Sequence, residues 1–546
     1  MKRLPIGIED FKELIDKDCY YVDKTSFITD IINEKVALYT RPRRFGKTLN
    51  MSMLYYFFSM KQKDNAYLFN DMDIVNHTDS LQYQNQYPVI FITLKDMKKH
   101  TFENQKAMFA ILIQDIVRKN QELLESEELN TFDKEQLIAY YRRSQSDVDL
   151  QNALKFLCGC LKQHYHKDVI LLIDEYDVPL QSAYLKGYYD EMADFLSGMF
   201  SAALKTNDAL EKGILTGCPR IAKESIFTGL NNFSVYSISE DQSSTSFGFT
   251  PKETITLLEH YDLKSYEQTI KEWYDGYLFG NKEIYNPWSV LKYVLKILQG
   301  NDVPESFWAN TSGNDIIYQY IQKADSQMRT DFDTLTSGGR ITQTVRYELT
   351  YREMDQINNI YSFLLFTGYL KAIACVDKDK AVYQLMIPNK EINRIYTLIF
   401  EEWFQEQVKA KSRTLVDAFM KEDVETANEV LNTILFKSIS YFDYDEKFYH
   451  GMLVGMLSDY QIVSNQETGN GRSDIMVLPA YKKKRGLVLE VKVATKEKDI
   501  EITAQRACHQ IREMNYIDGL QERGYTDIIG YGIAFYKKTC VIMLAK

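Results

Sequence analysis

Residues 41–48 read RPRRFGKT, a segment that ends in the Gly-Lys-Thr of a phosphate-binding loop but has Arg41 where such loops begin with glycine. In the usual loop, backbone N–H groups surround the phosphates, the lysine reaches the β and γ oxygens, and the hydroxyl coordinates magnesium. The apolar residues 36–40 predict a buried strand before the segment, and 49–59 predict a helix after it. A strand, loop and helix start in this order form an anion site, so a nucleotide is the first ligand to consider. The alternative is a chance Gly-Lys-Thr in a lysine-rich chain.

A second segment, 169–175, supports the nucleotide interpretation. It reads VILLIDE, an apolar run that ends in Asp174 and Glu175. This order is typical of a Walker B strand, in which the aspartate reaches magnesium and the next carboxylate polarises a water for attack on the γ-phosphate. By itself, the segment fits a core strand with a charged turn equally well. Its pairing with the phosphate-binding loop favours nucleotide binding.

Length and composition exclude several classes of protein. At 546 residues the chain is too long for one hydrophobic core, and its size predicts about three or four domains. A net charge of −11 argues against a surface that is basic throughout, although it leaves room for a local basic channel. Seven scattered cysteines fit reduced thiols better than a disulfide framework. Without a signal-peptide core or a run of membrane-spanning length, we expect a soluble, cytoplasmic protein with no membrane contact.

The fold class expected is α/β. Alternating strands and helices over residues 1–235 predict a P-loop NTPase domain with a doubly wound parallel sheet. Its expected strands lie near 36–40, 88–94, 169–173 and 213–216.

Three further regions are expected after this domain. Residues 236–300 predict a small, aromatic-rich, lid-type domain, in which Thr250 caps a helix and the aromatic side chains form a packed core rather than a base-stacking surface. Residues 301–435 predict a mainly helical connecting region. Residues 436–546 predict an α/β domain with a sheet of its own, including one long helix over 498–521.

In the C-terminal region, charged side chains occupy two neighbouring predicted strands. Asp474 lies on one strand, and Glu490 and Lys492 lie on the next, 486–493. Because strand side chains alternate, Glu490 and Lys492 point to one face, which can also hold Asp474. Two carboxylates beside a lysine suit phosphodiester hydrolysis. Asp474, Glu490 and the carbonyl of Val491 offer hard oxygens to Mg²⁺, and Lys492 can orient the water or stabilise charge on the phosphate.

Plainer interpretations remain open for these features. Glu490 and Lys492 can form a surface salt bridge, although the apolar neighbours of Glu490 predict a strand buried on both faces, where an unpaired carboxylate is costly. His450, in an apolar helix predicted near 446–460, fits a core histidine somewhat better than a catalytic one. The basic run 482–485 fits a solvated turn better than a nucleic-acid contact.

The order of motifs resembles that of bacterial AAA-ATPase-like proteins that carry a C-terminal PD-(D/E)XK nuclease-superfamily domain. The N-terminal motifs are YVDKT (21–25), RPRRFGKT (41–48), LLIDEYD (171–177), LTGCPR (215–220), AKES (222–225) and GLNN (229–232). The C-terminal motifs are FYHG (448–451), Glu467, GRSD (471–474) and EVK (490–492). The resemblance covers nearly the whole chain, and Arg41 agrees with this family's own form of the loop.

This resemblance implies a role for each matched residue. Nucleotide contact is implied at Arg44, Phe45, Gly46, Lys47, Thr48 and Leu49, magnesium binding at Thr48 and Asp174, water activation at Glu175, and a sensor at Thr216 or Arg220. The C-terminal domain becomes restriction-endonuclease-like, with metal ligation by Asp474, Glu490 and Val491, a catalytic Lys492, a further helix carboxylate at Glu446, and Gln510 as a weaker candidate. Arg43 or Arg44 could supply the charge that an arginine finger otherwise provides.

The leading hypothesis is an ATP-binding and ATP-hydrolysing protein whose nucleotide state regulates a nuclease that acts on DNA or RNA. It implies ATP and Mg²⁺ as cofactors, with Mn²⁺ as an alternative at the nuclease site, and it leaves a homo-oligomer open. A second hypothesis is a signalling or scaffold NTPase whose C-terminal domain binds nucleic acid or a partner without cleavage. A third is a nucleotide-binding module without turnover.

Overall fold

The computed structural model describes residues 1–218, 233–308, 326–347, 352–355, 359–437, 446–457, 461–468 and 471–545. The chain forms two compact units, Met1–Asn310 with Arg340–Asn393 and Thr311–Gly339 with Arg394–Lys546. Each unit contains a five-stranded sheet of its own. The bounds of the four predicted regions remain a prediction. Residues 340–393, which belong to the predicted connecting region, group with the N-terminal unit.

The first sheet is parallel throughout, with the order β2-β3-β4-β1-β5. Its strands are β1 (Val36–Thr40), β2 (Val89–Thr93), β3 (Val169–Asp174), β4 (Leu210–Gly217) and β5 (Phe233–Tyr236). Strands β1 and β3 are buried along their whole length, as continuous apolar runs in a parallel sheet require. Strand β4 lies between β1 and β3, so the phosphate-binding loop and Asp174 are separated by one strand.

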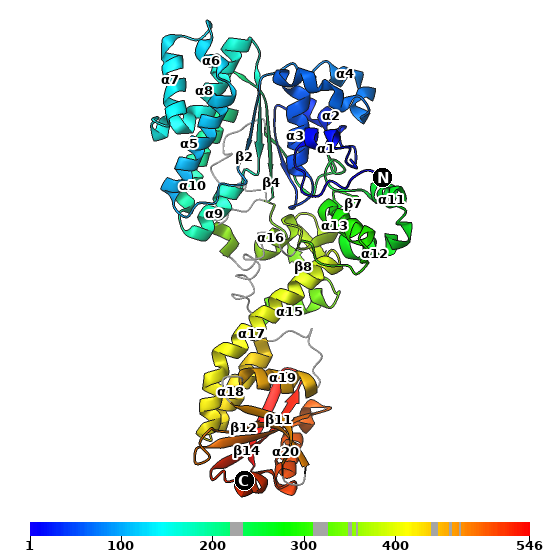
Figure 1. Ribbon diagram of the computed structural model, residues 1–546, viewed down its shortest axis with the longest axis vertical. Coiled ribbons are helices and arrows are strands. Elements are labelled where there is room, and N and C mark those ends of the chain that lie inside the picture. Colours follow the sequence, from blue (N-terminus) through cyan, green and yellow to red (C-terminus); the bar gives the residue numbers. More distant parts are fainter. Residues whose placement is uncertain are drawn as a thin grey trace. The chain divides into compact units, whose positions relative to one another are not determined.

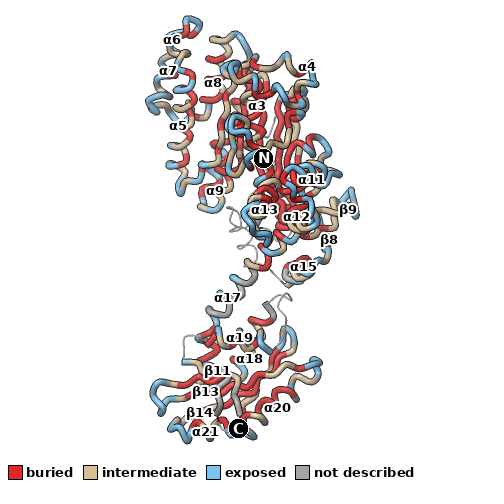
Figure 2. The backbone as a smooth tube through the Cα atoms, turned by 45° about the vertical axis from the view of Figure 1, so that its right-hand side comes forward, coloured by how far each residue is buried: buried red, intermediate tan, exposed pale blue. Residues whose placement is uncertain are grey.

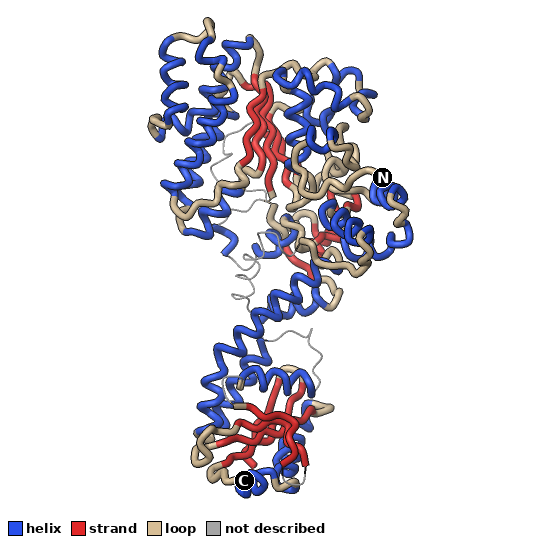
Figure 3. Tube along the Cα trace, viewed as in Figure 1, coloured by secondary structure: helices blue, strands red, loops and turns tan. Residues whose placement is uncertain are grey.

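Helices cover both faces of this sheet (Figures 1 and 3). They are α1 (Phe11–Asp16), α2 (Phe27–Ile32), α3 (Lys47–Phe58), α4 (Thr78–Leu81), α5 (Phe102–Lys119), α6 (Glu122–Glu125), α7 (Thr131–Arg142), α8 (Asp147–Tyr165), α9 (Val178–Lys186) and α10 (Tyr189–Leu204). Helix α3 lies on one face, and α8 and α10 lie on the other. The predicted doubly wound arrangement is therefore confirmed.

The aromatic-rich segment forms a core, as expected. Its elements are α11 (Pro251–His260), α12 (Glu267–Tyr274), β6 (Tyr277–Phe279), β7 (Lys282–Ile284) and α13 (Pro287–Leu298). Tyr274, Tyr285 and Val290 are buried in one cluster, which Leu4 from the N-terminal segment completes. Thr250 caps α11 by accepting from the third N–H of the helix, which confirms the predicted cap.

The middle of the chain combines helices with a small sheet. The helices are α15 (Ser326–Thr336), α16 (Ile360–Phe366) and α17 (Lys390–Met420), and β8 (Ile341–Thr344), β9 (Lys371–Asp377) and β10 (Val382–Met386) form an antiparallel sheet in the order β8-β10-β9. The sequence had not indicated this sheet. Helix α17 begins in the first unit and ends in the second.

The second unit contains a mixed sheet in sequential strand order. Its strands are β11 (Ile462–Thr468), β12 (Gly471–Val477), β13 (Gly486–Val493), β14 (Ile528–Tyr536) and β15 (Thr539–Ala545), and only β13 and β14 pair in parallel. Its helices are α18 (Val424–Lys437), α19 (Glu446–Met456), α20 (Ile500–Glu513) and α21 (Tyr516–Glu522). The single long helix predicted over 498–521 is wrong, because Asn515 takes a left-handed backbone with φ 52° and separates α20 from α21.

The faces and one edge of this sheet are covered. Met476 and Val488 pack with residues of α20 and α21 on one face, and Tyr449 of α19 stacks on Phe535 on the other. At the edge, Asn428 and Asn432 of α18 each donate to and accept from the backbone of β15. These side chains replace a further strand and satisfy groups that an edge strand otherwise exposes. Strand β13 is buried from Gly486 to Val491 (Figure 2).

Candidate functional site

The phosphate-binding loop turns between β1 and α3 on two residues with positive φ, Arg44 at 68° and Gly46 at 84°. The Nζ of Lys47 donates to the backbone carbonyls of Arg41 and Pro42, at 3.0 and 2.9 Å. These carbonyls satisfy an ammonium group that is almost fully buried. Lys47 therefore lies over the start of its own loop at the N-terminus of α3, where a bound phosphate would be an alternative partner.

Three of the predicted residues meet at the end of β3. Asp174 is fully buried, and its Oδ2 accepts from the hydroxyl of Thr48 at 2.7 Å, while its Oδ1 accepts from the hydroxyl of Thr216. Burial raises the pKa of Asp174, and the bonds from Thr216 and Thr48 oppose that rise. Thr216 reaches Asp174 because β4 lies beside β3 in the sheet. Both oxygens of this carboxylate thus have hydroxyl donors.

Glu175, which directly follows β3, has a left-handed backbone with φ 54°. A non-glycine residue in this region is uncommon and often marks a functional turn. Lys95, which the sequence reasoning missed, follows the neighbouring strand β2, where Thr93 pairs with Asp174. Its Nζ lies 2.8 Å from Glu9, and its pKa is raised by that bond first and also by the charge of Glu175. The available signal was a charged residue directly after a parallel strand.

Asp177 ends the motif LLIDEYD, but no role was assigned to it from the sequence. It occupies the cap position of α9, but its side chain does not cap that helix and accepts instead from the N–H of Cys218 at 3.2 Å. Burial and the charge of Glu175 raise the pKa of Asp177 to about 6, and the cations Lys47 and Arg43 oppose the rise. The cations of the phosphate-binding loop therefore act electrostatically on this buried carboxylate.

Arg41, the residue that departs from the glycine rule, points into the core. Its guanidinium donates to the carbonyls of Tyr236 at 2.8 Å and Ser243 at 3.2 Å, and it lies 5.1 Å and 5.2 Å from the ring centres of Phe247 and Phe279. Burial lowers the pKa of Arg41 to about 10, so it stays charged at neutral pH. Its backbone is outside the left-handed region, so this position does not need glycine. Arg41 therefore links the start of the loop to the end of β5 and to the segment that follows it.

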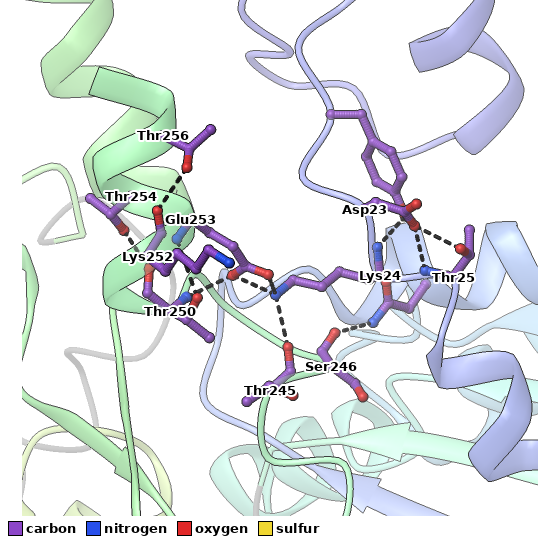
Figure 4. Close-up of polar contacts among 12 residues, drawn as sticks. Asp23, Lys24, Thr25, Thr245, Ser246, Thr250, Lys252, Glu253, Thr254 and Thr256 are labelled. Atoms are coloured by element: carbon purple, nitrogen blue, oxygen red, sulfur yellow. Dashed lines mark hydrogen bonds and ion pairs between the residues drawn. The ribbon is translucent and has the colours of Figure 1, made fainter. Parts of the chain in front are cut away.

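The motif at 21–25 anchors the same region through Lys24. The Nζ of Lys24 lies 2.7 Å from both carboxylate oxygens of Glu253 and 2.8 Å from the carbonyl of Thr245 (Figure 4). Glu253 also closes the capping box at the start of α11. Asn50 of α3 donates to Ser246 in the same loop at 2.8 Å. The N-terminal segment, α3 and α11 are therefore held together beside the phosphate-binding loop.

The second candidate site lies on β12 and β13. Because Ile475 pairs with Leu489, continuing the antiparallel register places Asp474 opposite Glu490 on one face. The Oδ2 of Asp474 accepts from the N–H of Val491 at 2.8 Å. This bond holds the side chain of Asp474 against β13.

Lys492 completes this arrangement. Its Nζ lies 3.7 Å from the Oε1 of Glu490 and donates to the Oε1 of Gln510 on α20 at 2.7 Å. The amide of Gln510 lies 3.5 Å from the hydroxyl of Tyr516. The structure thus brings Lys492 and Glu490 together with the weaker candidate Gln510.

The carboxylate of Glu490 is buried, with a side chain only 2% exposed. Its Oε2 has no hydrogen-bond partner among the residues that the structure describes. Burial, and then the charge of Asp474, raise the pKa of Glu490 to about 8, and Lys492 opposes the rise. This burial excludes a salt bridge on an exposed strand.

Four further residues that the sequence analysis named have fewer described contacts with these two sites or none. Glu446 is the first residue of α19 and is exposed, and His450, one helical turn later, has its Nε2 3.1 Å from the carbonyl of Asp474. Arg220 and the side chain of Glu467 lie outside the described residues.

Asp474 and Glu490 fit a hard divalent cation. Magnesium is usually held by one or two carboxylates and keeps several waters, and the unpartnered Oε2 of Glu490 is an oxygen of the kind it prefers. Within the described ranges, no three His, Cys, Asp or Glu side chains form a group that could hold a metal. Besides these two carboxylates, the carbonyl of Val491 predicted from the sequence and water are further oxygens open to such a cation.

Two family models match the chain in the regions that contain these sites. Residues 5–227 match a family described as predicted AAA-ATPase, and residues 444–544 match the PD-(D/E)XK nuclease superfamily. The chain contains an AAA-ATPase-like domain and a PD-(D/E)XK nuclease-superfamily domain. The AAA-ATPase-like domain includes the phosphate-binding loop and Asp174, and the nuclease-superfamily domain includes Asp474, Glu490 and Lys492. The resemblance drawn from the sequence is therefore confirmed.

The chain is also similar to an uncharacterized protein in the vnfD 5′ region of Azotobacter chroococcum mcd 1, with 27% identity over 299 residues. The match covers 53% of this chain and 51% of that protein, so it spans about half of each. In the parts of the two domains and their connection that the structure describes, no helix is both long and apolar enough to cross a membrane.

Proposed function

We propose that the chain binds and hydrolyses ATP, and that the nucleotide state of its AAA-ATPase-like domain controls a metal-dependent nuclease that cleaves DNA or RNA. The observation that carries the nuclease assignment is the buried carboxylate of Glu490, which has an unpartnered oxygen beside Asp474 and Lys492. Such a group is costly to bury and is typical of a site that a ligand completes.

The nucleotide half of the proposal assigns the following roles. Backbone N–H groups from Arg44 to Leu49 surround the phosphates. The Nζ of Lys47 leaves the carbonyls of Arg41 and Pro42 and binds phosphate oxygens instead. Thr48 and Asp174 hold the magnesium of Mg-ATP, and Glu175 orients the attacking water. The contacts of Thr48 and Thr216 with Asp174 support this assignment, because they bring the three residues together.

In the nuclease half, Asp474 and Glu490 hold Mg²⁺ or Mn²⁺, which when bound supplies a Lewis acid and a water of lowered pKa. Lys492 holds the attacking water or stabilises negative charge on the phosphate. Gln510 keeps the ammonium of Lys492 in place. Water attacks the phosphorus, one ester P–O bond breaks, and the leaving oxygen takes up a proton.

A packed route from the loop towards α17 supports regulation by nucleotide. Phe45 of the loop packs edge-on against Tyr277 of β6, with ring centres 4.9 Å apart. Gly276, next to Tyr277, has φ 90°, and a Cβ there would lie 2.2 Å from the carbonyl oxygen of Pro388. Asn389 donates to the backbone of the same turn at 2.6 Å. The loop is thus linked to the residues directly before α17.

The first turn of α17 is fixed by Glu391, which is fully buried. Its Oε1 accepts from the hydroxyl of Ser289 and from the N–H of Trp308, both at 3.0 Å. Burial raises the pKa of Glu391 to about 7. Helix α17 then continues into the second unit. A contiguous packed route is a physical basis for coupling, and only a perturbation experiment establishes it.

The test is cleavage of plasmid, single-stranded DNA and RNA by the full chain, with Mg²⁺ or Mn²⁺ and with or without ATP. We expect Asp474→Ala and Lys492→Ala each to abolish cleavage, and Lys47→Ala to abolish the effect of ATP. Lys496→Ala is the matched control, because Lys496 is exposed in the same domain. Tyr277→Leu should leave ATP binding intact and weaken the effect of ATP on cleavage.

Cleavage that is indifferent to both Asp474→Ala and Lys492→Ala would overturn the nuclease half. If Lys47→Ala then abolished a nucleic-acid or partner response, the chain would be a signalling or scaffold NTPase. Phosphate release that depends on Glu175 would exclude a module without turnover.

A further inference from the structure

The three arginines of the phosphate-binding loop point in three directions. Arg41 enters the core, and Arg44 is exposed with its guanidinium 4.5 Å from the ring centre of Trp288 on α13. Arg43 donates from its Nη2 to the Oε1 of Gln181 on α9 at 2.7 Å. The two arginines that can reach outside the core are therefore held by different elements.

Arg43 and Lys47 both act on buried groups next to the loop. The Nζ of Lys47 is 3.9 Å from the Sγ of Cys218, and the N–H of Cys218 donates to Asp177. Burial raises the pKa of both Asp177 and Cys218, and the charges of Lys47 and Arg43 oppose the rise at both groups. Both cations therefore act on the same pair of buried groups.

The segment that positions Arg43 is the one that carries Glu175. Gln181 donates its N–H to the carbonyl of Asp177, so the two residues lie one turn apart on the same face of α9. Glu175 is two residues before Asp177 in the chain. Glu175 and the acceptor of Arg43 therefore lie on one short segment after β3.

We propose that Arg43 contacts the γ-phosphate of ATP from within the same chain, and that Gln181 is its positioning residue. The inference rests on the proposed nucleotide site and deepens it. In hydrolysis, water attacks the γ-phosphorus and the bond to the β–γ bridging oxygen breaks. ADP leaves with that electron pair, and the proton of the water passes to Glu175 and then to solvent. Arg43 stabilises the charge on the transferred phosphoryl group, a role worth several orders of magnitude in other NTPases.

The test compares the affinities of ATPγS and ADP by calorimetry, together with steady-state phosphate release. For Arg43→Ala we expect about a tenfold loss of affinity for ATPγS, less than about a twofold loss for ADP, and about a 100-fold or greater loss in kcat. Arg44→Ala should have much smaller effects on all three, because its side chain stacks on Trp288. Arg118→Ala, an exposed arginine on α5, is the matched control.

The role of Gln181 is tested by a double-mutant cycle. Gln181→Ala should lower kcat with little change in KM, Gln181→Glu should restore part of the loss because it keeps an acceptor, and Gln181→Ala should cost little more in the Arg43→Ala background. Equal losses for ATPγS and ADP in Arg43→Ala, or a larger loss in Arg44→Ala, would overturn the inference while leaving the nucleotide site intact. If the wild-type chain bound neither nucleotide, the proposed nucleotide site and this inference would fall together.

Discussion

Asp174 in the AAA-ATPase-like domain and Glu490 in the nuclease-superfamily domain are both buried carboxylates on apolar strands, Asp174 at the end of β3 and Glu490 within β13, but their partners differ. Both oxygens of Asp174 accept from threonine hydroxyls. Glu490 has one oxygen without a partner among the described residues, and its nearest cation, Lys492, is 3.7 Å away and also bonded to Gln510. Asp174 is satisfied within the fold, whereas Glu490 is not.

The difference indicates what each site requires from a ligand. A satisfied carboxylate costs the fold little, so the proposed nucleotide site needs no cation to stabilise Asp174 in the folded state. A buried carboxylate with an unpartnered oxygen raises the free energy of the folded state, and a bound cation removes that cost. We therefore expect metal to matter more for the stability of the nuclease-superfamily domain than for the other domain.

The largest effect is expected for Glu490→Gln. The amide keeps the size of the side chain but loses the negative charge that a cation needs, so cleavage should fall by about 1,000-fold or more, while the melting temperature in EDTA should not fall. Nuclease assays and calorimetry measure both quantities. Glu497→Gln, at an exposed position in the same domain, is the control. If the variant were less stable and still cleaved nucleic acid, Glu490 would be a structural residue. The contrast with Asp174 would then not reflect metal binding.

For Asp174→Asn the expected loss is smaller. The amide oxygen can still accept from one of the two threonines, but magnesium loses a charged ligand, so phosphate release should fall by about 100-fold. Radiolabelled ATP hydrolysis measures this loss, and binding of ADP without magnesium serves as the folding control. Unchanged phosphate release would mean that Asp174 is only a partner for the hydroxyls.

Thr216→Val tests whether Asp174 needs both hydroxyls. Removal of one donor leaves a buried carboxylate oxygen without a partner, so the free energy of unfolding of the first unit should fall by about 1–3 kcal/mol. Denaturant unfolding, with hydrogen exchange of β3 to assign the transition, measures the change. Thr93→Val is the control, because the hydroxyl of Thr93 contacts the N–H of Lys95. A change below about 0.5 kcal/mol would show that the hydroxyl of Thr216 adds little to the stability of Asp174, so Asp174 and Glu490 would differ less in stability than in contacts.

The most gradual effect is a pH dependence in the metal-free protein. The pKa of Glu490 is raised from 4.5 to about 8, so between these values the folded state holds a proton that the unfolded chain has lost. This stabilisation is complete below pH 4.5 and is lost as the pH rises through 8, by at most about 1.4 kcal/mol per pH unit. Hydrogen exchange of β13 in EDTA should show it, and Glu490→Gln should flatten the dependence. An equally steep dependence in the variant would assign the proton to another group.

Much of the fold followed from local patterns. The apolar run before RPRRFGKT, the run before Asp174 and the strand with Glu490 all occur where they were expected, because a buried strand requires consecutive or alternating apolar residues. Strands β8 to β10 and the break at Asn515 were missed, because short strands and a single left-handed residue leave little trace in hydrophobic periodicity.

The candidate sites were predictable in residue type but not in contacts. The sequence indicated Lys47, Asp174, Glu490 and Lys492, because their chemistry is specific and their spacing is local. It did not indicate Lys95, whose electrostatic interaction with Glu175 depends on the parallel pairing of β2 and β3. It could not assign Arg41 either, since its partners Tyr236 and Ser243 lie about 200 residues away in the chain.

The sequence by itself determined the residues of a phosphate-binding loop motif, an acidic strand end and a second set of carboxylates, because each lies within a short stretch of the chain. Only the tertiary structure decided that Arg41 supports the loop from the core, that Arg43 is held by Gln181 of α9, and that Glu490 has an oxygen without a partner among the described residues. These outcomes depend on strand order and on which helix packs beside each side chain. These contacts are made by residues that are distant in the chain, so no local sequence pattern could have predicted them.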